Sequence, residues 1–333
     1  MNVKKICIAA LLMASALAVS CAVEPVEDSS YSYDRVMKAW LAMNYPGLKP
    51  FGDSGAYILE MQQGTGPAVT DSSYVWAHYT KLSLDRSVIS SNERSVAEQL
   101  GTYSPTSYYG SRIWRVDQDY IPSGLEAVIK TMKGGGRALI ALPLSASSHT
   151  SSLYSAFSGS DESDNSIIEI KIDTVMADIY DYQERVMKEW FRSHYNVADT
   201  SAEHLYFKKL KEKTAETDSI SEGSTVKVRY IGRHLDGQVF DTNIEDTAKF
   251  YRIHTQGKTY DALNVTFYKD DVSKLAQENT TVAGFYRSVS MMNYGETAVA
   301  LFSSELGYGE KGSSPAIPEY SPLLFWFYVE PKD

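Results

Sequence analysis

The chemistry that this sequence could support is centred on aromatic side chains and one aspartate near its C-terminal end. Asp241 closes the run Leu235-Asp-Gly-Gln-Val-Phe-Asp241, which contains an Asp-Gly hairpin signal. Further along, Tyr308 stands between two glycines. A tyrosine in such a turn has no core to fill, so its hydroxyl is available to a ligand. We expect these residues to contribute to an aromatic pocket.

Three further segments are needed to surround that pocket. Val226 to Tyr230 alternates apolar and basic residues, which is typical of a half-buried antiparallel strand. Val282 to Phe285 begins a short helix, and Leu323 to Val329 has the composition of a strand. These segments lie far apart in the sequence, so the pocket requires a folded domain to assemble it.

Other classes of site find little support in the sequence. The six histidines have no metal-ligand spacing, and there is no HExxH motif, nucleophile elbow or P-loop. The sequence therefore predicts neither a metal nor a cofactor. A net charge of −10 and the lack of a basic tract argue against nucleic acid as a partner.

The N-terminal residues predict export and a lipid anchor. Lys4 and Lys5 precede an apolar run, and Leu17-Ala-Val-Ser-Cys21 resembles a lipobox in which Cys21 becomes the lipidated residue. We expect residues 1–20 to be a lipoprotein signal peptide and 21–32 a polar tether. An ordinary cleaved signal with an incidental cysteine is the alternative. The expected location is the cell envelope, lipid-anchored at the outer membrane on its periplasmic or surface face.

Three ordered sequence matches indicate an internal duplication. Their offset grows slowly from 150 to about 160 residues. The matched pairs are Arg35-Val-Met-Lys-Ala-Trp-Leu41 with Arg185-Val-Met-Lys-Glu-Trp-Phe191, Ala77-His-Tyr79 with Val228-Arg-Tyr230, and Ile121-Pro-Ser-Gly-Leu125 with Val282-Ala-Gly-Phe285. We expect one copy over 33–173 and another over 180–333, each beginning with an amphipathic helix. Trp40 and Trp190 mark the apolar faces of these helices. A symmetric dimer of the chain is left as an open alternative.

The second copy closely resembles the FKBP-type peptidyl-prolyl isomerases over about 205–330. The motifs occur in the order of the family: Val228-Arg-Tyr-Ile-Gly232, Leu235-Asp-Gly-Gln-Val-Phe-Asp241, Val282-Ala-Gly-Phe285, Met292-Asn-Tyr-Gly295, Leu306-Gly-Tyr-Gly-Glu-Lys-Gly312, and Ile317-Pro318 leading to Leu323-Leu-Phe325. The resemblance implies two tandem α+β domains, each a twisted antiparallel sheet around one short helix.

The resemblance also implies roles for individual residues. Three are expected to be catalytic: Asp241 at the pocket mouth, Tyr308 as a hydroxyl donor and Phe285 as the floor. The expected substrate-binding residues are Tyr230, Phe240 and Phe325 as walls, Val282 through its backbone N–H, and Ile317 at the rim. Val265 or Phe267 is expected to fill a further wall position.

Two departures from the family concern the pocket. The stretch 242–280 is longer than a connection needs, and we expect an insertion that forms a lid, a partner surface or a plug. Asp246 stands roughly where many members have an arginine that pairs with the pocket aspartate. In the first copy, Ile89-Ser90 replaces the expected Phe-Asp although Tyr79, Ile121, Gly124 and Leu125 match, so that copy is expected to be inactive.

The function that the resemblance implies is lipid-anchored peptidyl-prolyl isomerisation by the second domain, assisting the folding of exported proteins. Its expected partners are proline-containing peptides, unfolded exported proteins and a macrocycle ligand. A non-catalytic peptide-binding, chaperone or surface-assembly module on the same fold is the alternative.

Overall fold

The computed structural model describes residues 29–332, apart from 117, 119, 148–164, 198–201, 214–218 and 270. The predicted signal peptide and Cys21 lie outside the described residues. Within these residues, none of the helices combines the length and the apolar character that crossing a bilayer requires.

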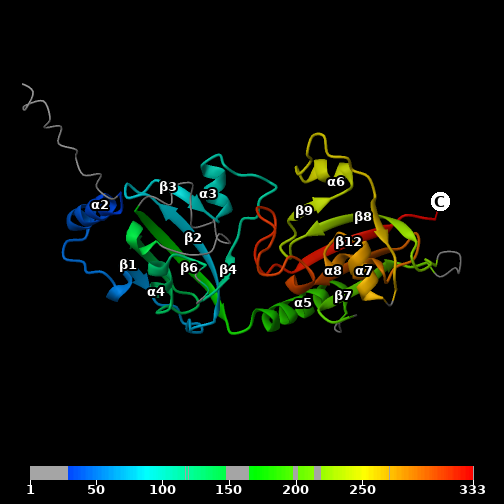
Figure 1. Ribbon diagram of the computed structural model, residues 1–333, viewed down its shortest axis with the longest axis horizontal. Coiled ribbons are helices and arrows are strands. Elements are labelled where there is room, and N and C mark those ends of the chain that lie inside the picture. Colours follow the sequence, from blue (N-terminus) through cyan, green and yellow to red (C-terminus); the bar gives the residue numbers. More distant parts are fainter. Residues whose placement is uncertain are drawn as a thin grey trace, which may run out of the picture.

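Each half of the chain folds around its own six-stranded antiparallel sheet (Figure 1). The elements of the first half are α2 (Ser29–Asn44), η1 (Gly52–Ser54), β1 (Tyr57–Gln62), β2 (Tyr74–Leu82), β3 (Val88–Ser91), α3 (Arg94–Gln99), β4 (Arg112–Arg115), α4 (Ser123–Ile129), β5 (Arg137–Leu142), η2 (Leu144–Ala146) and β6 (Ser166–Met176). Those of the second half are α5 (Ile179–Tyr195), β7 (Leu205–Lys211), β8 (Thr225–Arg233), β9 (Val239–Thr242), α6 (Glu245–Phe250), β10 (Leu263–Thr266), α7 (Val272–Glu278), α8 (Ala283–Val289), β11 (Thr297–Phe302), η5 (Ser304–Leu306) and β12 (Leu323–Val329).

The two sheets have the same topology. The first runs β1-β5-β6-β2-β3 with β4 also paired to β2, and the second runs β10-β8-β12-β11-β7 with β9 also paired to β8. Each strand of one sheet thus has a counterpart in the other, in the same chain order. The predicted fold class, two tandem α+β domains that each follow an amphipathic helix, is confirmed.

One short helix packs on the inner face of each sheet, and a glycine lets it approach closely. A Cβ atom at Gly284 of α8 would lie 2.3 Å from the Phe302 ring, and one at Gly124 of α4 would lie 2.8 Å from Ala146. Since real Cβ atoms do not come so close to their neighbours, glycine is required at both positions. Leu125 and Phe285 follow these glycines and are buried in the two cores.

The preceding helices pack on the opposite faces of their own sheets. On α5, Met187 and Phe191 are buried against Val299 and Leu301 of β11. The corresponding cluster under α2 includes partly buried Trp40, and Trp190 likewise belongs to the cluster of its own domain. The tryptophan-marked helices therefore each complete one domain, because both bury their apolar stripe locally.

A buried asparagine follows the third strand of the second domain. The Asn243 Oδ1 accepts a hydrogen bond from the Tyr230 N–H at 2.9 Å. Its Nδ2 donates to the carbonyls of Val228 at 2.8 Å and Asp261 at 3.1 Å. This side chain therefore fastens the segment after α6 to the edge of β8.

The first domain contains the same device at Asn92. Its Oδ1 accepts from the Tyr79 N–H at 2.8 Å, and its Nδ2 donates to the carbonyls of Ala77 at 3.2 Å and Gly110 at 2.8 Å. Helices α3 and α6, which follow the two asparagines, are also equivalent. Most of the stretch that we expected to be an insertion, 242–280, therefore belongs to the duplicated unit.

Between the fourth strand and the short helix, the described residues of the second copy contain an additional region, which includes α7. The offset between the copies is 151 residues at Arg112 and Leu263 but 160 residues at Ser123 and Ala283, a difference of nine residues. Leu275 of α7 is buried in the second core. The additional segment thus contributes to the core of the domain, and not to a detached lid.

We expect Asn243→Ala to lower the unfolding free energy of the second domain by about 2 kcal/mol or more, because it leaves buried backbone groups without partners. Urea unfolding of the full chain measures this. The matched control is Asn264→Ala on an exposed position of β10, for which we expect a change below about 0.5 kcal/mol. Equal effects of the two variants would contradict the role assigned to Asn243.

Candidate functional site

Four aromatic rings of the second domain pack edge to face between helix α8 and the sheet. Phe285 of α8 lies 5.3 Å from Tyr230, 5.3 Å from Phe325 and 4.8 Å from Phe327, measured between ring centroids. Interplanar angles of 83° to 87° make these contacts T-shaped. The ring of Phe285 is 3% exposed and lies at the base of the cluster. This arrangement brings the predicted floor and two of the predicted walls together.

The third predicted wall depends on a glycine. Phe240 lies 5.6 Å from Phe325 at 82°, across β8. A Cβ atom at Gly232 would come within 2.6 Å of the Phe240 ring and 2.9 Å of the Phe325 ring. Any side chain at this position of β8 would therefore displace both walls.

The aspartate at the pocket mouth has three hydrogen-bond partners. The Tyr230 hydroxyl donates to Asp241 Oδ2 at 2.6 Å, and the Thr242 N–H donates to Oδ1 at 2.9 Å. Lys258 Nζ donates to the same Oδ1 at 2.8 Å and forms an ion pair with it. The side chains of Lys258 and Asp241 are about two-fifths exposed, so solvent screens the pair.

The cation beside Asp241 therefore comes from a position that the sequence did not indicate. Asp246 stands roughly where the resemblance places an arginine that would pair with the pocket aspartate. The chain instead returns after α6 and places Lys258 there, with its ammonium also 5.4 Å from the Tyr260 ring. Sequence spacing alone gives no signal for this contact, because it depends on the path of the loop.

Two tyrosine hydroxyls of the site are held in their protonated form. Burial raises the pKa of the Tyr230 phenol far above its usual range, and the charge of Asp241 and its hydrogen bond raise it further. Burial also raises the pKa of Tyr308, and the charge of Asp241 adds to that effect. Both hydroxyls are therefore hydrogen-bond donors at neutral pH, and Tyr308, which is 41% exposed, is accessible to a ligand.

The remaining predicted residues border the same cluster. Ile317 is buried in it, while Val282 packs partly buried against it at the start of α8. Within the described part of the chain, the N–H of Val282 has no hydrogen-bond partner. Val265 of β10 belongs to the same cluster, and its role as a further wall stays a prediction. Seven of the eight predicted pocket residues thus belong to this cluster or bond to it, and the charge of Asp241 acts on the eighth, Tyr308.

One histidine at the edge of the site was not predicted. His234 is 4% exposed, its ring lies 5.1 Å from Phe240, and its Nε2 donates to the Ala316 carbonyl at 2.8 Å. Burial lowers the pKa of its imidazole. The neutral ring therefore connects the wall at Phe240 to the rim beside Ile317.

The equivalent place in the first domain lacks these rings. Leu125 stands for Phe285, and Ile168 of β6 stands for Phe325 at the same register. Lys81, which is 6% exposed, occupies the position of Gly232, where a Cβ atom in the second domain would meet the Phe240 and Phe325 rings. The first copy therefore differs from the second in its aromatic residues as well as in the missing aspartate.

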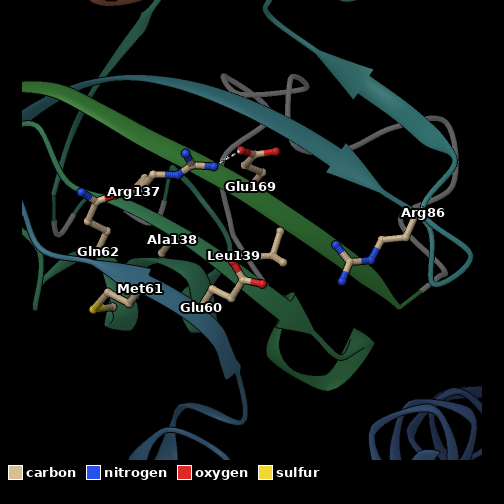
Figure 2. Close-up of a pocket in the computed structure, with 8 residues that line it drawn as sticks. All are labelled: Glu60, Met61, Gln62, Arg86, Arg137, Ala138, Leu139 and Glu169. Atoms are coloured by element: carbon tan, nitrogen blue, oxygen red, sulfur yellow. Dashed lines mark hydrogen bonds and ion pairs between the residues drawn. The ribbon is translucent and has the colours of Figure 1, made fainter. Parts of the chain in front are cut away.

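A separate polar groove of about 420 Å³ lies on the outer face of the first sheet (Figure 2). Three of its charged side chains already have partners within the chain, because Arg137 contacts Glu169 at 3.0 Å and Arg86 donates to the Tyr45 hydroxyl at 2.9 Å. The described residues contain no cluster of three or more histidine, cysteine or acidic side chains arranged to hold a metal ion. The aromatic cluster with Asp241 is therefore the candidate site.

Comparison with known proteins places the similarity in the second domain. Residues 216–329 match the family model of the FKBP-type peptidyl-prolyl cis-trans isomerases. A probable FKBP-type peptidyl-prolyl cis-trans isomerase of Haemophilus influenzae is 30% identical over 114 residues, which are 34% of this chain and 37% of that protein. The FK506-binding protein 1A of Aspergillus fumigatus is 27% identical over 118 residues, which are 35% of this chain and 86% of that protein.

Solved structures give a weaker likeness. The three FKBP domains of wheat FKBP73 align over 84% of this chain and 95% of that chain, with 18% identity and a TM-score of 0.29. A peptidyl-prolyl cis-trans isomerase from Pseudomonas syringae aligns over 45% of this chain and 90% of that chain, with 19% identity and a TM-score of 0.31.

We expect Phe285→Leu, which installs the residue of the first copy, to lower the unfolding free energy by about 1 to 2 kcal/mol through lost ring packing. Thermal or urea unfolding measures the change. Phe250→Leu is the matched control, since Phe250 is 78% exposed and should tolerate the same substitution. A Phe285 variant as stable as this control would show that the floor is not packed as described.

Proposed function

We propose that the second domain, which matches the family model of the FKBP-type peptidyl-prolyl cis-trans isomerases over residues 216–329, catalyses the cis–trans isomerisation of X-Pro bonds in peptides. The observation that carries the proposal is the packing of Tyr230, Phe285 and Phe325 beside an aspartate that Tyr230 holds by a 2.6 Å hydrogen bond. The family match over the same residues supports it.

The chemistry needs no covalent step. Rotation about an X-Pro bond is slow because its barrier is about 20 kcal/mol, which reflects amide resonance. In the twisted form the nitrogen lone pair is localised and the carbonyl loses that resonance. A dry pocket that binds the twisted form more tightly than either planar form therefore lowers the barrier.

The residues divide this task between shape and polarity. The aromatic walls and the Phe285 floor receive the proline ring and exclude water. The Val282 N–H and the Tyr308 hydroxyl each donate a hydrogen bond to a peptide carbonyl, which fixes the peptide across the pocket. Asp241 places a negative charge at the mouth of the pocket. Its carboxylate faces the X-Pro amide bond that rotates.

Lys258 acts through Asp241. Its ammonium orients the carboxylate together with Tyr230 and keeps it from turning toward the peptide carbonyl. Since the ion pair is exposed to solvent, its contribution is small and depends on salt. Lys258 is therefore a positioning residue of this site.

We further propose that the protein is lipid-anchored through Cys21 in the cell envelope and assists the folding of exported proteins. The apolar run of the N-terminal residues and the lipobox-like sequence support this. A macrocycle of the FK506 type is the proposed ligand of the same pocket, as the name of the Aspergillus relative suggests.

We expect Asp241→Ala to lower kcat/KM for a short X-Pro peptide by more than tenfold, because the carboxylate is lost from the reacting end of the pocket. Lys258→Ala should lower it about two- to fivefold at low salt, and less at high salt. Lys249→Ala removes another exposed lysine, which pairs with Glu245 at 2.7 Å, and should change nothing. A wild-type chain that binds FK506 but adds no rate would identify a non-catalytic binding module instead.

We expect Cys21→Ser to move the protein from the membrane fraction to the soluble fraction of cells and to abolish incorporation of labelled fatty acid. Incorporation that persists in Cys21→Ser would exclude this anchor. The single cysteine that precedes it, Cys7, lies inside the predicted signal peptide and provides the matched control as Cys7→Ser.

A further inference from the structure

A loop of the first domain reaches the edge of the second-domain site. The Tyr108 N–H donates to the Pro315 carbonyl at 2.8 Å, and the Ser107 carbonyl accepts from Gln238 Nε2 at 2.9 Å. Pro315 stands two residues before Ile317, and Gln238 stands two residues before Phe240. The first domain therefore holds the chain beside the rim and beside one wall of the pocket.

The segment that it holds, residues 313–320, is here called the rim segment. Ser313 and Ile317 exchange backbone hydrogen bonds of 2.7 and 2.8 Å, which closes it into a small loop. At its far end, the Tyr320 N–H donates to the Gly309 carbonyl at 2.9 Å, next to Tyr308. In Figure 1 the orange-red chain before β12 lies between the two domains. The rim segment therefore links the interface to both Ile317 and the Tyr308 turn.

A buried ion pair fastens the rim segment to the first sheet. Arg112 on β4 donates to both carboxylate oxygens of Glu319, at 2.8 and 2.5 Å. The side chains of Arg112 and Glu319 are 17% and 3% exposed, respectively. Such a two-pronged contact fixes orientation as well as distance. Removing one partner from a pair this deeply buried leaves an uncompensated charge.

The contact continues to the pocket wall through His234. The Tyr108 ring packs against the His234 ring at 5.0 Å, and that imidazole also contacts Phe240, the Ala316 carbonyl and the Ser321 hydroxyl. Tyr108 of the first domain therefore contacts His234, which lies between the Phe240 wall and the rim segment.

We propose that the first domain sets the geometry of the second-domain pocket, with Arg112, Tyr108 and Gln238 as positioning residues that hold the rim segment and the Phe240 wall in the peptide-receiving arrangement. The proposal rests on the function proposed above. The first domain, which lacks the aromatic site, thereby influences how tightly the second domain binds an X-Pro peptide.

The second copy shows that the docking is specific to the first. Leu263 occupies the position of Arg112. The stretch 255–261, which is equivalent to the first-domain loop 104–110 that contains Ser107 and Tyr108, is exposed apart from the partly buried Tyr260. The loop thus folds without a docking partner. Leucine occupies the equivalent position in the second copy, so the strand can carry it, while in Arg112→Leu the buried Glu319 loses its partner.

The test compares full-length wild type, Arg112→Leu and Arg112→Lys. For Arg112→Leu we expect a rise in KM of about three- to tenfold for a tetrapeptide with one X-Pro bond, with kcat unchanged, because a looser rim weakens binding in every state. Hydrogen exchange at the Ser313 and Ile317 amides should become faster by a similar factor. Arg112→Lys keeps the positive charge but loses the two-pronged guanidinium contact, so its KM and its exchange rates should lie between those of wild type and Arg112→Leu.

Arg137→Leu is the control, since Arg137 pairs with a glutamate in the same domain but on the outer face (Figure 2). It should change neither KM nor exchange at the rim. If Arg112→Leu does not fold, Gln238→Ala removes a single contact of a partly exposed side chain and carries the same expectation.

If KM and the hydrogen-exchange rates of the rim segment equal those of wild type in these variants, the proposal is overturned. Absence of isomerisation by wild type would overturn the proposed function, while the exchange measurement would still decide whether the first domain holds the rim.

Discussion

The close approach of two aromatic rings to the backbone of Gly232 is the constraint on which the aromatic site of the second domain depends. A Cβ atom there would lie 2.6 Å from Phe240 and 2.9 Å from Phe325. The first domain has the same strands in the same register but carries Lys81 at this position. Because its counterparts of Phe240 and Phe325 are Ile89 and Ile168, the first domain has no aromatic rings that need a glycine there.

The two domains are stabilised by the same devices and differ in a few chemical positions. Asn92 and Asn243 each fix the chain after the third strand with hydrogen bonds to equivalent backbone groups. Glycines in α4 and α8 bring the helix against the sheet in both. Folding and chemistry are thus encoded at separate positions, so the first copy could lose its polar pocket residues and keep its fold.

Much of this could be predicted from the sequence, because the relevant signals are local. The duplicated helices with Trp40 and Trp190 indicated two units, and the motifs around Tyr230, Phe285 and Tyr308 indicated one aromatic pocket. The repeated loop was missed because its two versions share backbone features and few residue types. Gly101 and Arg252, for example, occupy equivalent places with φ of 69° and 60°. Lys258 and Arg112 could not be assigned, because their contacts depend on how distant segments fold.

The connection between the domains is short. Strand β6 ends at Met176 and α5 begins at Ile179, so two residues lie between them. Interface groups joined in this way meet at a high effective concentration, and little further entropy is lost when they dock. One ion pair, the hydrogen bonds of Ser107 and Tyr108, and an apolar cluster that includes Ile113, Ile179 and Tyr320 can therefore keep the domains together. Covalent fusion lets these contacts form without the loss of translational and rotational freedom that joining two separate chains would cost.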